Sequence, residues 1–204
     1  MIAIIDYDAG NIKSVAKALE YLGEVPVVTR DKEILRKADK VILPGVGSFG
    51  DAMHKLYEYD LVGVIKEIIQ NKTPFLGICL GLQLLFESSE ESPGVKGLGI
   101  LKGKIVRFSE ENNLKIPHIG WNSLSYPKKG ILFEGIAENS YVYFVHSYYL
   151  QAEEDVVVAT SEYGNLIHAS VEKDNLFACQ FHPEKSSEVG LAILRNFITY
   201  ERRD

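Results

Sequence analysis

Hydrophobic positions along the first ninety residues follow two alternating patterns. Four short runs are apolar at nearly every position, which is typical of strands buried on both faces; they are residues 2–6, 25–29, 40–44 and 74–78. Between these runs apolar residues recur at helical spacing, as Val15, Leu19 and Leu22 do. Strands that alternate with helices predict a parallel sheet whose faces are covered by helices.

The helical pattern continues in four further segments. The predicted helices span residues 31–38, 49–71, 80–88 and 187–203. In the last of them Val189, Ile193 and Phe197 recur at every fourth position, so they lie on one face. Ser186 or Ser187 can cap the N-terminus of this helix.

After Pro93 the pattern changes to strand-like segments with hairpin-type breaks. These segments are residues 103–109, 119–126, 140–150, 155–163, 166–173 and 176–181. Because short hairpins join antiparallel strands, the second half is predicted to be more antiparallel. We therefore predict a single α/β domain over residues 1–204, with a central, mostly parallel, helix-flanked sheet and an antiparallel extension in its second half.

The composition is that of an ordinary globular protein, with 46% hydrophobic and 25% charged residues in a chain of 204. The net charge is −6 and no basic run occurs, which argues against nucleic acid and anionic membranes as partners. The N-terminus lacks a signal-peptide pattern, and no apolar run reaches the ~18 residues of a membrane span. Two cysteines are too few for a disulfide framework or a structural zinc site. These features predict a cytoplasmic protein without a metal or cofactor.

Cys79 stands where a strand-like run turns into a helical one, between Gly77 and Gly81. Such a glycine-flanked turn is typical of a nucleophile elbow, and the following helix N-terminus stabilises a thiolate. On the residues alone, a buried and inert thiol remains the alternative. Cys179 is in step with the phenylalanines two positions before and after it, so we interpret it as a core residue.

A second candidate site is the sequence QFHPEKSS, residues 180–187, between the last strand and the last helix. Its proline stiffens the turn that carries His182 and Glu184. A thiol nucleophile needs a base, and a carboxylate bonded to the far ring nitrogen of a histidine fixes its tautomer. His118 and His146 are alternative bases, and a solvated histidine beside a capping glutamate is the non-catalytic alternative.

Gly45, Gly47 and Gly50 spell the glycine pattern of dinucleotide-binding sites, after a strand and before a helix. This pattern follows the third strand rather than the first, and no acidic residue ends a well-placed strand about 20 positions on. A glycine-rich turn can equally direct backbone N–H groups at a carbonyl oxygen, as in an oxyanion hole. A nucleotide-binding protein therefore remains an alternative, which a lack of NAD(P) or ATP binding would exclude.

Together these stretches resemble the class I glutamine amidotransferases. Three motifs occur in the order found in that family: PGVGSFG at 44–50, GICLGLQLLF at 77–86 and FHPEKS at 181–186. DYDAGN near the start and PHIGWN in the middle extend the resemblance over nearly the whole chain. PHIGWN, Val46 and Lys185 separate the chain from the family members that serve GMP, anthranilate and carbamoyl phosphate synthesis.

The resemblance implies that the chain hydrolyses L-glutamine to glutamate and ammonia through a thioester on Cys79. His182 would be the base and Glu184 would orient it, which removes that role from the other histidines. The implied oxyanion donors are backbone N–H groups of Leu80, Val46 and Gly47. The implied glutamine contacts are Gln83, Glu91, Ser147 and Tyr148.

The resemblance also implies a partner, a (βα)8-barrel synthase (cyclase) subunit that forms a heterodimer with the glutaminase and receives its ammonia internally. The predicted interface residues are Asn11, His118, Trp121, Tyr143 and Lys185, of which the two aromatic ones suit interface anchors. We further expect the oxyanion amides to point correctly only rarely before that partner binds.

Two alternatives keep the same fold. One is the glutaminase of another class I amidotransferase, such as the pyridoxal phosphate synthase type, which would feed a different acceptor. The other is a non-catalytic scaffold subunit. A scaffold has no physical need for Cys79, His182 and Glu184 together, so their presence argues for an enzyme.

Overall fold

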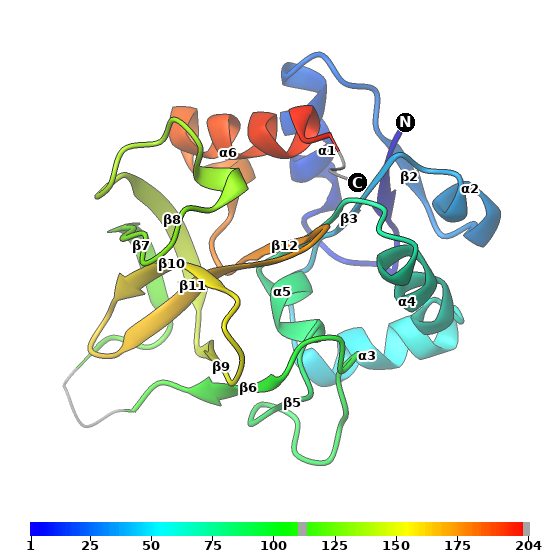
Figure 1. The fold of residues 1–204 in the computed structure, drawn as a ribbon. Coiled ribbons are helices and arrows are strands. Elements are labelled where there is room, and N and C mark those ends of the chain that lie inside the picture. Colours follow the sequence, from blue (N-terminus) through cyan, green and yellow to red (C-terminus); the bar gives the residue numbers. More distant parts are fainter. Residues whose placement is uncertain (110–113, 202–204) are drawn as a thin grey trace.

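A seven-stranded sheet forms the centre of the computed structural model, which describes residues 1–109 and 114–201 (Figure 1). Its strand order is β10-β11-β12-β4-β3-β1-β2. Five neighbouring strands are parallel: β1 (Ile2–Ile5), β2 (Val27–Thr29), β3 (Lys40–Leu43), β4 (Phe75–Ile78) and β12 (Leu176–Cys179). β11 (Leu166–Lys173) and β10 (Val157–Glu162) continue the sheet beyond β12 in antiparallel fashion.

Helices cover both faces of the parallel part of the sheet (Figure 1). One face carries α1 (Ile12–Tyr21) and α6 (Ser187–Thr199). The other face carries α2 (Lys32–Arg36), α3 (Phe49–Glu58), α4 (Val62–Gln70) and α5 (Leu80–Leu84). The strands are therefore apolar on both sides, as their continuous hydrophobic runs predict.

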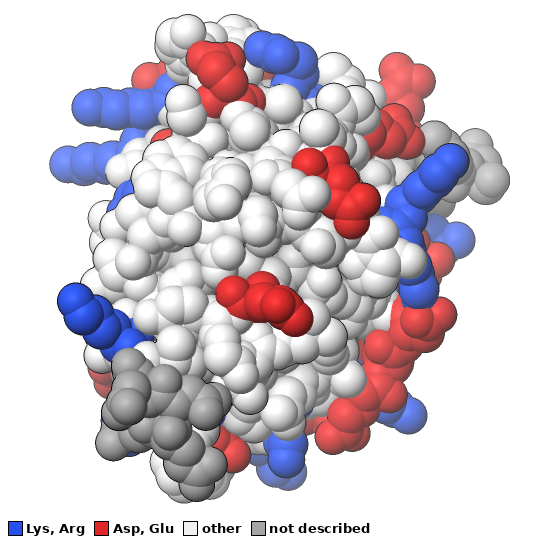
Figure 2. Space-filling view, turned by 90° about the vertical axis from the view of Figure 1, so that its left-hand side faces the viewer, with Lys and Arg blue, Asp and Glu red and all other residues white. Residues whose placement is uncertain are grey.

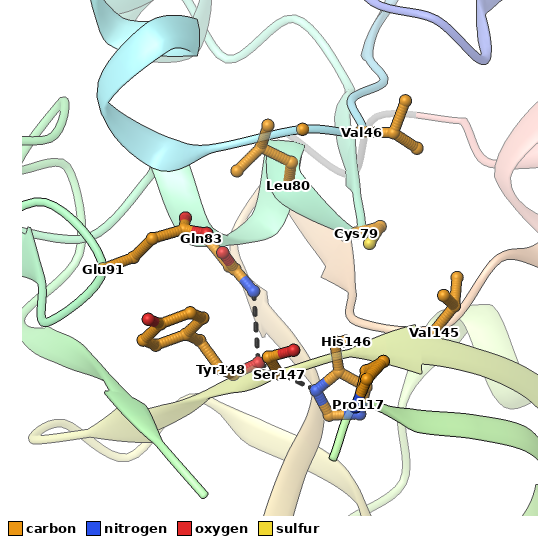
Figure 3. A pocket seen from close by; sticks show the side chains of 11 residues that line it. Val46, Cys79, Leu80, Gln83, Glu91, Pro117, Val145, His146, Ser147 and Tyr148 are labelled. Atoms are coloured by element: carbon orange, nitrogen blue, oxygen red, sulfur yellow. Dashed lines mark hydrogen bonds between the residues drawn. The ribbon is translucent and has the colours of Figure 1, made fainter.

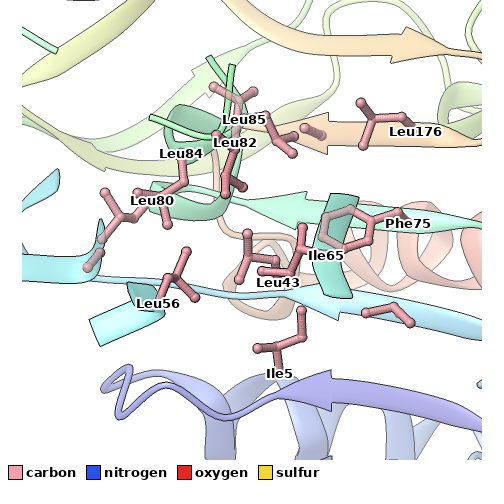
Figure 4. Close-up of a cluster of buried hydrophobic side chains, with 14 of the residues drawn as sticks. Ile5, Leu43, Leu56, Ile65, Phe75, Leu80, Leu82, Leu84, Leu85 and Leu176 are labelled. Atoms are coloured by element: carbon pink, nitrogen blue, oxygen red, sulfur yellow. The ribbon is translucent and has the colours of Figure 1, made fainter. Parts of the chain in front are cut away.

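Alternate side chains of each strand enter two separate cores. Ile2 and Ile4 of β1 belong to the cluster under α1 and α6. Ala3 and Ile5 point the other way and join the cluster that contains Leu56 of α3 (Figure 4). This two-residue period follows from the pleat of a strand, and it holds the carboxyl ends of β3, β4 and β12 in a rigid frame.

Two small sheets lie beside the central one. The first consists of β5 (Ser88–Ser89), β6 (Gly103–Arg107) and β9 (Tyr148–Ala152). The second is a hairpin-like pair of β7 (His118–Ser123) and β8 (Tyr141–His146). The described residues also include the short 3-10 turns η2 (Ile131–Phe133) and η3 (Pro183–Lys185).

The predicted α/β architecture, with a mostly parallel sheet and added antiparallel strands, is confirmed, but several element boundaries were wrong. The helix predicted over 49–71 is two helices, because Asp60 takes a left-handed conformation (φ 51°) between α3 and α4. The helix predicted over 80–88 ends at Leu84. The strand predicted over 140–150 divides at Ser147, and its halves enter different sheets. The last helix ends at Thr199, and its predicted end at residue 203 lies outside the described residues.

Candidate active site

Cys79 occupies a sharp turn between β4 and α5. Its backbone angles are φ 53° and ψ −106°, a conformation that side-chain-bearing residues rarely adopt. The turn is fixed on both sides: the Cys79 N–H donates to the Cys179 carbonyl at 2.7 Å, and the Cys79 carbonyl accepts from the Leu82 N–H at 3.0 Å. The thiol is therefore presented from a strained elbow at the carboxyl edge of the sheet.

The two glycines around Cys79 are required by close backbone contacts. A Cβ atom on Gly81 would lie 1.9 Å from the Leu43 carbonyl oxygen of β3. A Cβ atom on Gly77 would lie 2.8 Å from the Gly81 carbonyl oxygen. The first turn of α5 can rest directly on the strands only because both side chains are missing.

His182 and Glu184 form a buried pair next to the elbow. His182 Nδ1 lies 2.8 Å from Glu184 Oε1, and both side chains are fully buried. Because a carboxylate only accepts hydrogen bonds, Nδ1 carries a proton, and Nε2 is the nitrogen left to exchange a proton with a nucleophile. Within residues 1–109 and 114–201, no group forms a hydrogen bond with Nε2. The Asn11 amide also donates to Glu184 Oε1, at 3.2 Å, which holds the carboxylate in place.

The electrostatics of this pair favour a proton on His182. Burial disfavours the charged ring, but the interactions with Cys79 and Glu184 outweigh it and raise the pKa of His182 to about 10. An imidazolium formed at His182 is therefore stabilised by its two neighbours. Cys179 differs, because complete burial raises the pKa of its thiol well above the usual value, as expected of a core cysteine.

The Cys79 thiol borders a cavity of about 280 Å³ (Figure 3). All of the residues predicted to bind the oxyanion or glutamine line it: Val46, Gly47, Leu80, Gln83, Glu91, Ser147 and Tyr148. The remaining lining residues are Pro117, Val145 and His146. The cavity lies between α5, the glycine-rich turn after β3 and the β8–β9 junction, so segments far apart in the sequence meet there.

The glycine-rich turn is held close to Leu80. The Leu80 N–H donates to the Gly45 carbonyl at 3.3 Å, and the Tyr7 hydroxyl donates to the Pro44 carbonyl at 2.6 Å. Gly47 has a φ of 110°, a conformation that favours glycine. The Leu80 N–H therefore has to leave the Gly45 carbonyl, or share its hydrogen, before it can bind an oxyanion.

Glu91 occupies the helix end where the dinucleotide pattern would place a phosphate. Its Oε2 accepts from the Phe49 N–H at 2.7 Å, and the neighbouring Ser92 hydroxyl accepts from the Gly50 N–H at 2.9 Å. A second anion at this N-terminus would meet a carboxylate. The glycine pattern is therefore part of the cavity around Cys79 rather than a phosphate cradle.

Gln180 belongs to the site, although the sequence reasoning did not single it out. Its side chain is fully buried, and its Nε2 donates to Cys79 Sγ at 3.6 Å. Its Oε1 accepts from Gln83 Nε2 at 3.1 Å. The signal in the sequence is the two-residue spacing of Gln180 and His182, because alternate residues of an extended segment face the same side.

The five predicted interface residues divide into two groups. Trp121 is 52% exposed, Lys185 is exposed and Tyr143 is half-buried, and the Trp121 and Tyr143 rings are 6.1 Å apart. Asn11 and His118 are buried, with exposed fractions of 5% and 3%. Because both side chains are largely enclosed by the chain itself, little of either is exposed to a partner, and their role at an interface stays a prediction.

The described residues contain neither a candidate metal cluster nor a candidate membrane span. Within this part of the chain, no three or more histidine, cysteine or acidic side chains gather where they could hold a metal ion. None of its helices has the length and apolar character needed to cross a membrane.

The family described as "Glutamine amidotransferase class-I" matches residues 3–200. The chain is 52% identical over 198 residues to "Imidazole glycerol phosphate synthase subunit HisH" of Methanocaldococcus jannaschii, covering 97% of this chain and 98% of that protein. It is 51% identical over 197 residues to the protein of the same name in Bacillus cereus, covering 97% and 93%.

Two solved structures share the fold at lower sequence identity. One is described as "Crystal structure of glutamine amidotransferase", with a TM-score of 0.76, 21% identity and 97% of both chains covered. The other is "Structure of PurLQS from Thermotoga maritima", with a TM-score of 0.74, 21% identity and 98% and 97% covered.

Proposed function

Because this chain belongs to the class-I glutamine amidotransferase family, we propose that it is the glutaminase subunit of imidazole glycerol phosphate synthase. In this role it hydrolyses L-glutamine to glutamate and ammonia for histidine biosynthesis. The observation that carries the proposal is the Glu184–His182 pair, which interacts with Cys79 and whose Nε2 has no hydrogen-bond partner among the described residues. The names of the relatives that are about half identical over nearly the full chain support the choice of this family member.

The chemistry begins with transfer of the Cys79 thiol proton to His182 Nε2. The thiolate then forms a bond to the side-chain carboxamide carbon of glutamine. When the tetrahedral intermediate collapses, the C–N bond breaks and His182 delivers the proton to the leaving ammonia. Water hydrolyses the γ-glutamyl thioester, which releases glutamate and restores the thiol. Glu184 keeps Nδ1 protonated and stabilises the imidazolium throughout.

The cavity supplies the contacts for the substrate. Gln83 uses the two hydrogens of Nε2 on the Tyr148 carbonyl and on Gln180, which leaves its Oε1 to contact the glutamine α-ammonium. Glu91 has one oxygen bonded to the Phe49 N–H, and its other oxygen adds negative charge near the same ammonium. Ser147 and Tyr148 contribute backbone groups from the opposite wall.

The ammonia passes to a (βα)8-barrel synthase (cyclase) subunit in a cytoplasmic heterodimer. That subunit binds the ribonucleotide acceptor and makes imidazole glycerol phosphate and aminoimidazole carboxamide ribonucleotide. The side of the molecule that bears β7 and β10 has few charged side chains at its centre, and the charges gather at its margins (Figure 2). Trp121 and Tyr143, on the β7–β8 pair, are the proposed aromatic anchors, and Lys185 is the last residue of η3, the turn that carries Glu184.

The test is ammonia release from glutamine by the purified chain, alone and with the barrel subunit and its nucleotide ligand. We expect strong stimulation by the partner, and loss of activity in Cys79→Ala but not in Cys179→Ala, the matched change at the buried core thiol. Full activity in Cys79→Ala would overturn the mechanism. Activity that depends on Cys79 but is not stimulated by the barrel subunit would indicate a different acceptor enzyme, such as pyridoxal phosphate synthase.

A further inference from the structure

The geometry points to Gln180 as a further residue of the active site. We propose that its side-chain amide donates a hydrogen bond to Cys79 Sγ, stabilises the sulfur as a thiolate, and links the nucleophile to the glutamine-binding residue Gln83. This inference rests on the proposed function and deepens it. Gln180 touches the reacting atom itself, so it is argued as a catalytic residue rather than as a remote support.

The sheet register places Gln180 beside the nucleophile. β12 pairs in parallel with β4, with Cys179 opposite Ile78. The next residues along the two strands, Gln180 and Cys79, therefore lie side by side at the carboxyl edge of the sheet. The Gln180 N–H donates to the Ala169 carbonyl at 2.8 Å, which anchors its backbone to β11 while its side chain faces the sulfur.

A backbone carbonyl sets the direction of the hydrogen bonds that reach Cys79. The Tyr148 carbonyl can only accept, and it receives hydrogens from His146 Nδ1 at 2.8 Å and Gln83 Nε2 at 3.3 Å (Figure 3). The second hydrogen of Gln83 Nε2 then goes to Gln180 Oε1. The remaining end of the Gln180 amide, its NH2 group, must face Cys79. The orientation of the Gln83 and Gln180 amides thus follows from the Tyr148 carbonyl, which cannot donate a hydrogen bond.

A donor at this position changes the chemistry of the sulfur. An N–H group interacts more strongly with a charged thiolate than with a neutral thiol, so it favours ionisation. The same bond stabilises the sulfur when the thioester is cleaved and the thiolate leaves. Because the Gln180 side chain is fully buried, its hydrogen bond to the sulfur is weakened little by solvent.

The main experiment uses Gln180→Leu and Gln180→Glu in the complex with the barrel subunit. Gln180→Glu keeps an oxygen for Gln83 but places a carboxylate rather than an N–H against the sulfur. The rate of Cys79 alkylation by iodoacetamide at pH 7 should fall about tenfold or more, and its pH profile should move to higher pH. We expect kcat to fall by a similar factor while KM for glutamine changes by less than about threefold, with the larger effect in Gln180→Glu.

Asn175 offers a matched control at the opposite end of β12. It precedes β12, whereas Gln180 follows it, and its buried amide donates to the Ile69 and Thr73 carbonyls at 3.3 and 2.6 Å. Asn175→Leu should lower thermal stability but leave the pH profile of alkylation unchanged. If Asn175→Leu and Gln180→Leu shift the profile and kcat alike, Gln180 has only a structural role and the inference fails.

Two further results separate the inference from the proposed function. An inactive Cys79→Ala beside a Gln180→Leu with wild-type kcat and alkylation would overturn the inference alone, whereas an active Cys79→Ala would overturn the proposed function.

If the Gln180 variants do not fold, the wild-type chain still gives a test by NMR, because it contains only four glutamines, so few side-chain signals overlap. After 15N-glutamine labelling, the Gln180 NH2 signals should shift over the pH range in which Cys79 becomes reactive, and not in Cys79→Ala. Signals that stay constant in the wild type would overturn the inference.

Discussion

The buried histidine pair shows how individual residues acquire fixed protonation states. His146 donates from Nδ1 to the Tyr148 carbonyl, so its Nε2 accepts from His118 Nδ1, 3.0 Å away. His118 lies between the rings of Phe144 and Tyr163, with centroid distances of 4.8 and 3.9 Å. Burial lowers the pKa of His118 to about 4 and that of His146 to about 3. Both rings are therefore neutral at physiological pH, and their low pKa values make them weak bases.

The first prediction concerns this pair. Its ring NMR signals should keep the neutral pattern from pH 8 down to about pH 5.5, whereas a titration near 6.5 would contradict the assignment. Since the folded pKa values lie below the ordinary histidine value, the unfolded chain binds more protons between about pH 4 and 6.5. The contribution of the pair to stability is thus complete above about pH 6.5 and is lost as the pH falls toward 4. Urea unfolding midpoints measured across this range check the sign.

At the scale of elements, the elbow depends on contact between α5 and β3. Gly81→Ala would push a methyl group into the Leu43 carbonyl, and backbone atoms cannot move aside as the end of a flexible side chain can. We expect it to cost about 2 kcal/mol or more of unfolding free energy and to reduce glutaminase activity strongly. Chemical unfolding and ammonia release measure both effects.

Gly63 provides the control for this change. It lies inside α4 and a Cβ atom there would meet nothing within 4 Å. Gly63→Ala should therefore stabilise the chain by about 0.5–1 kcal/mol and leave activity unchanged. Equal effects of the two substitutions would show that the contact with Leu43 does not determine the elbow.

The sequence predicts the helices and strands well where the hydrophobic pattern continues over many residues without a break. The parallel strands follow from continuous apolar runs, and α6 follows from a repeated four-residue spacing. It fails where one residue breaks an otherwise continuous pattern. Asp60 divides a helix by adopting a left-handed conformation. Aspartate tolerates this conformation, but its presence in a sequence does not predict it. Ser147 divides a strand because two sheets compete for its neighbours, which is a tertiary effect.

The same distinction applies to the site. Cys79, His182 and Glu184 carry local signals, since glycines and a proline mark their turns. Gln180 carries the same alternation, but its importance depends on the register between β12 and β4, which no local pattern specifies. The burial of Asn11 and His118 likewise depends on packing against Glu184 and against aromatic rings from other segments. Motif membership therefore located these residues near the site but did not reveal which way they face.

At the scale of the whole molecule, the proposed docking face is tied directly to the catalytic turn. The Tyr143 carbonyl of β8 accepts from the His182 N–H at 2.9 Å, and the Tyr143 N–H donates to the Ser186 hydroxyl at 2.9 Å. On the neighbouring strand β7, the ring of Trp121 packs against Tyr143, and Trp121 is about half exposed. A large aromatic side chain that is about half exposed and supported by a neighbouring ring is well suited to anchor an interface.

The last prediction follows from this position. Trp121→Ala should raise the Kd for the barrel subunit at least about tenfold, because truncating an aromatic anchor typically costs more than 1 kcal/mol of binding free energy. It should change the stability of the free chain by less than about 0.5 kcal/mol, since half of the side chain already faces solvent. Val25→Ala is the control: Val25 is 85% exposed and lies next to β2, at the far edge of the central sheet. Calorimetric titrations that give the same Kd for Trp121→Ala and Val25→Ala would exclude the β7–β8 pair as the docking face, because only one of the two positions can border a partner that receives ammonia from Cys79.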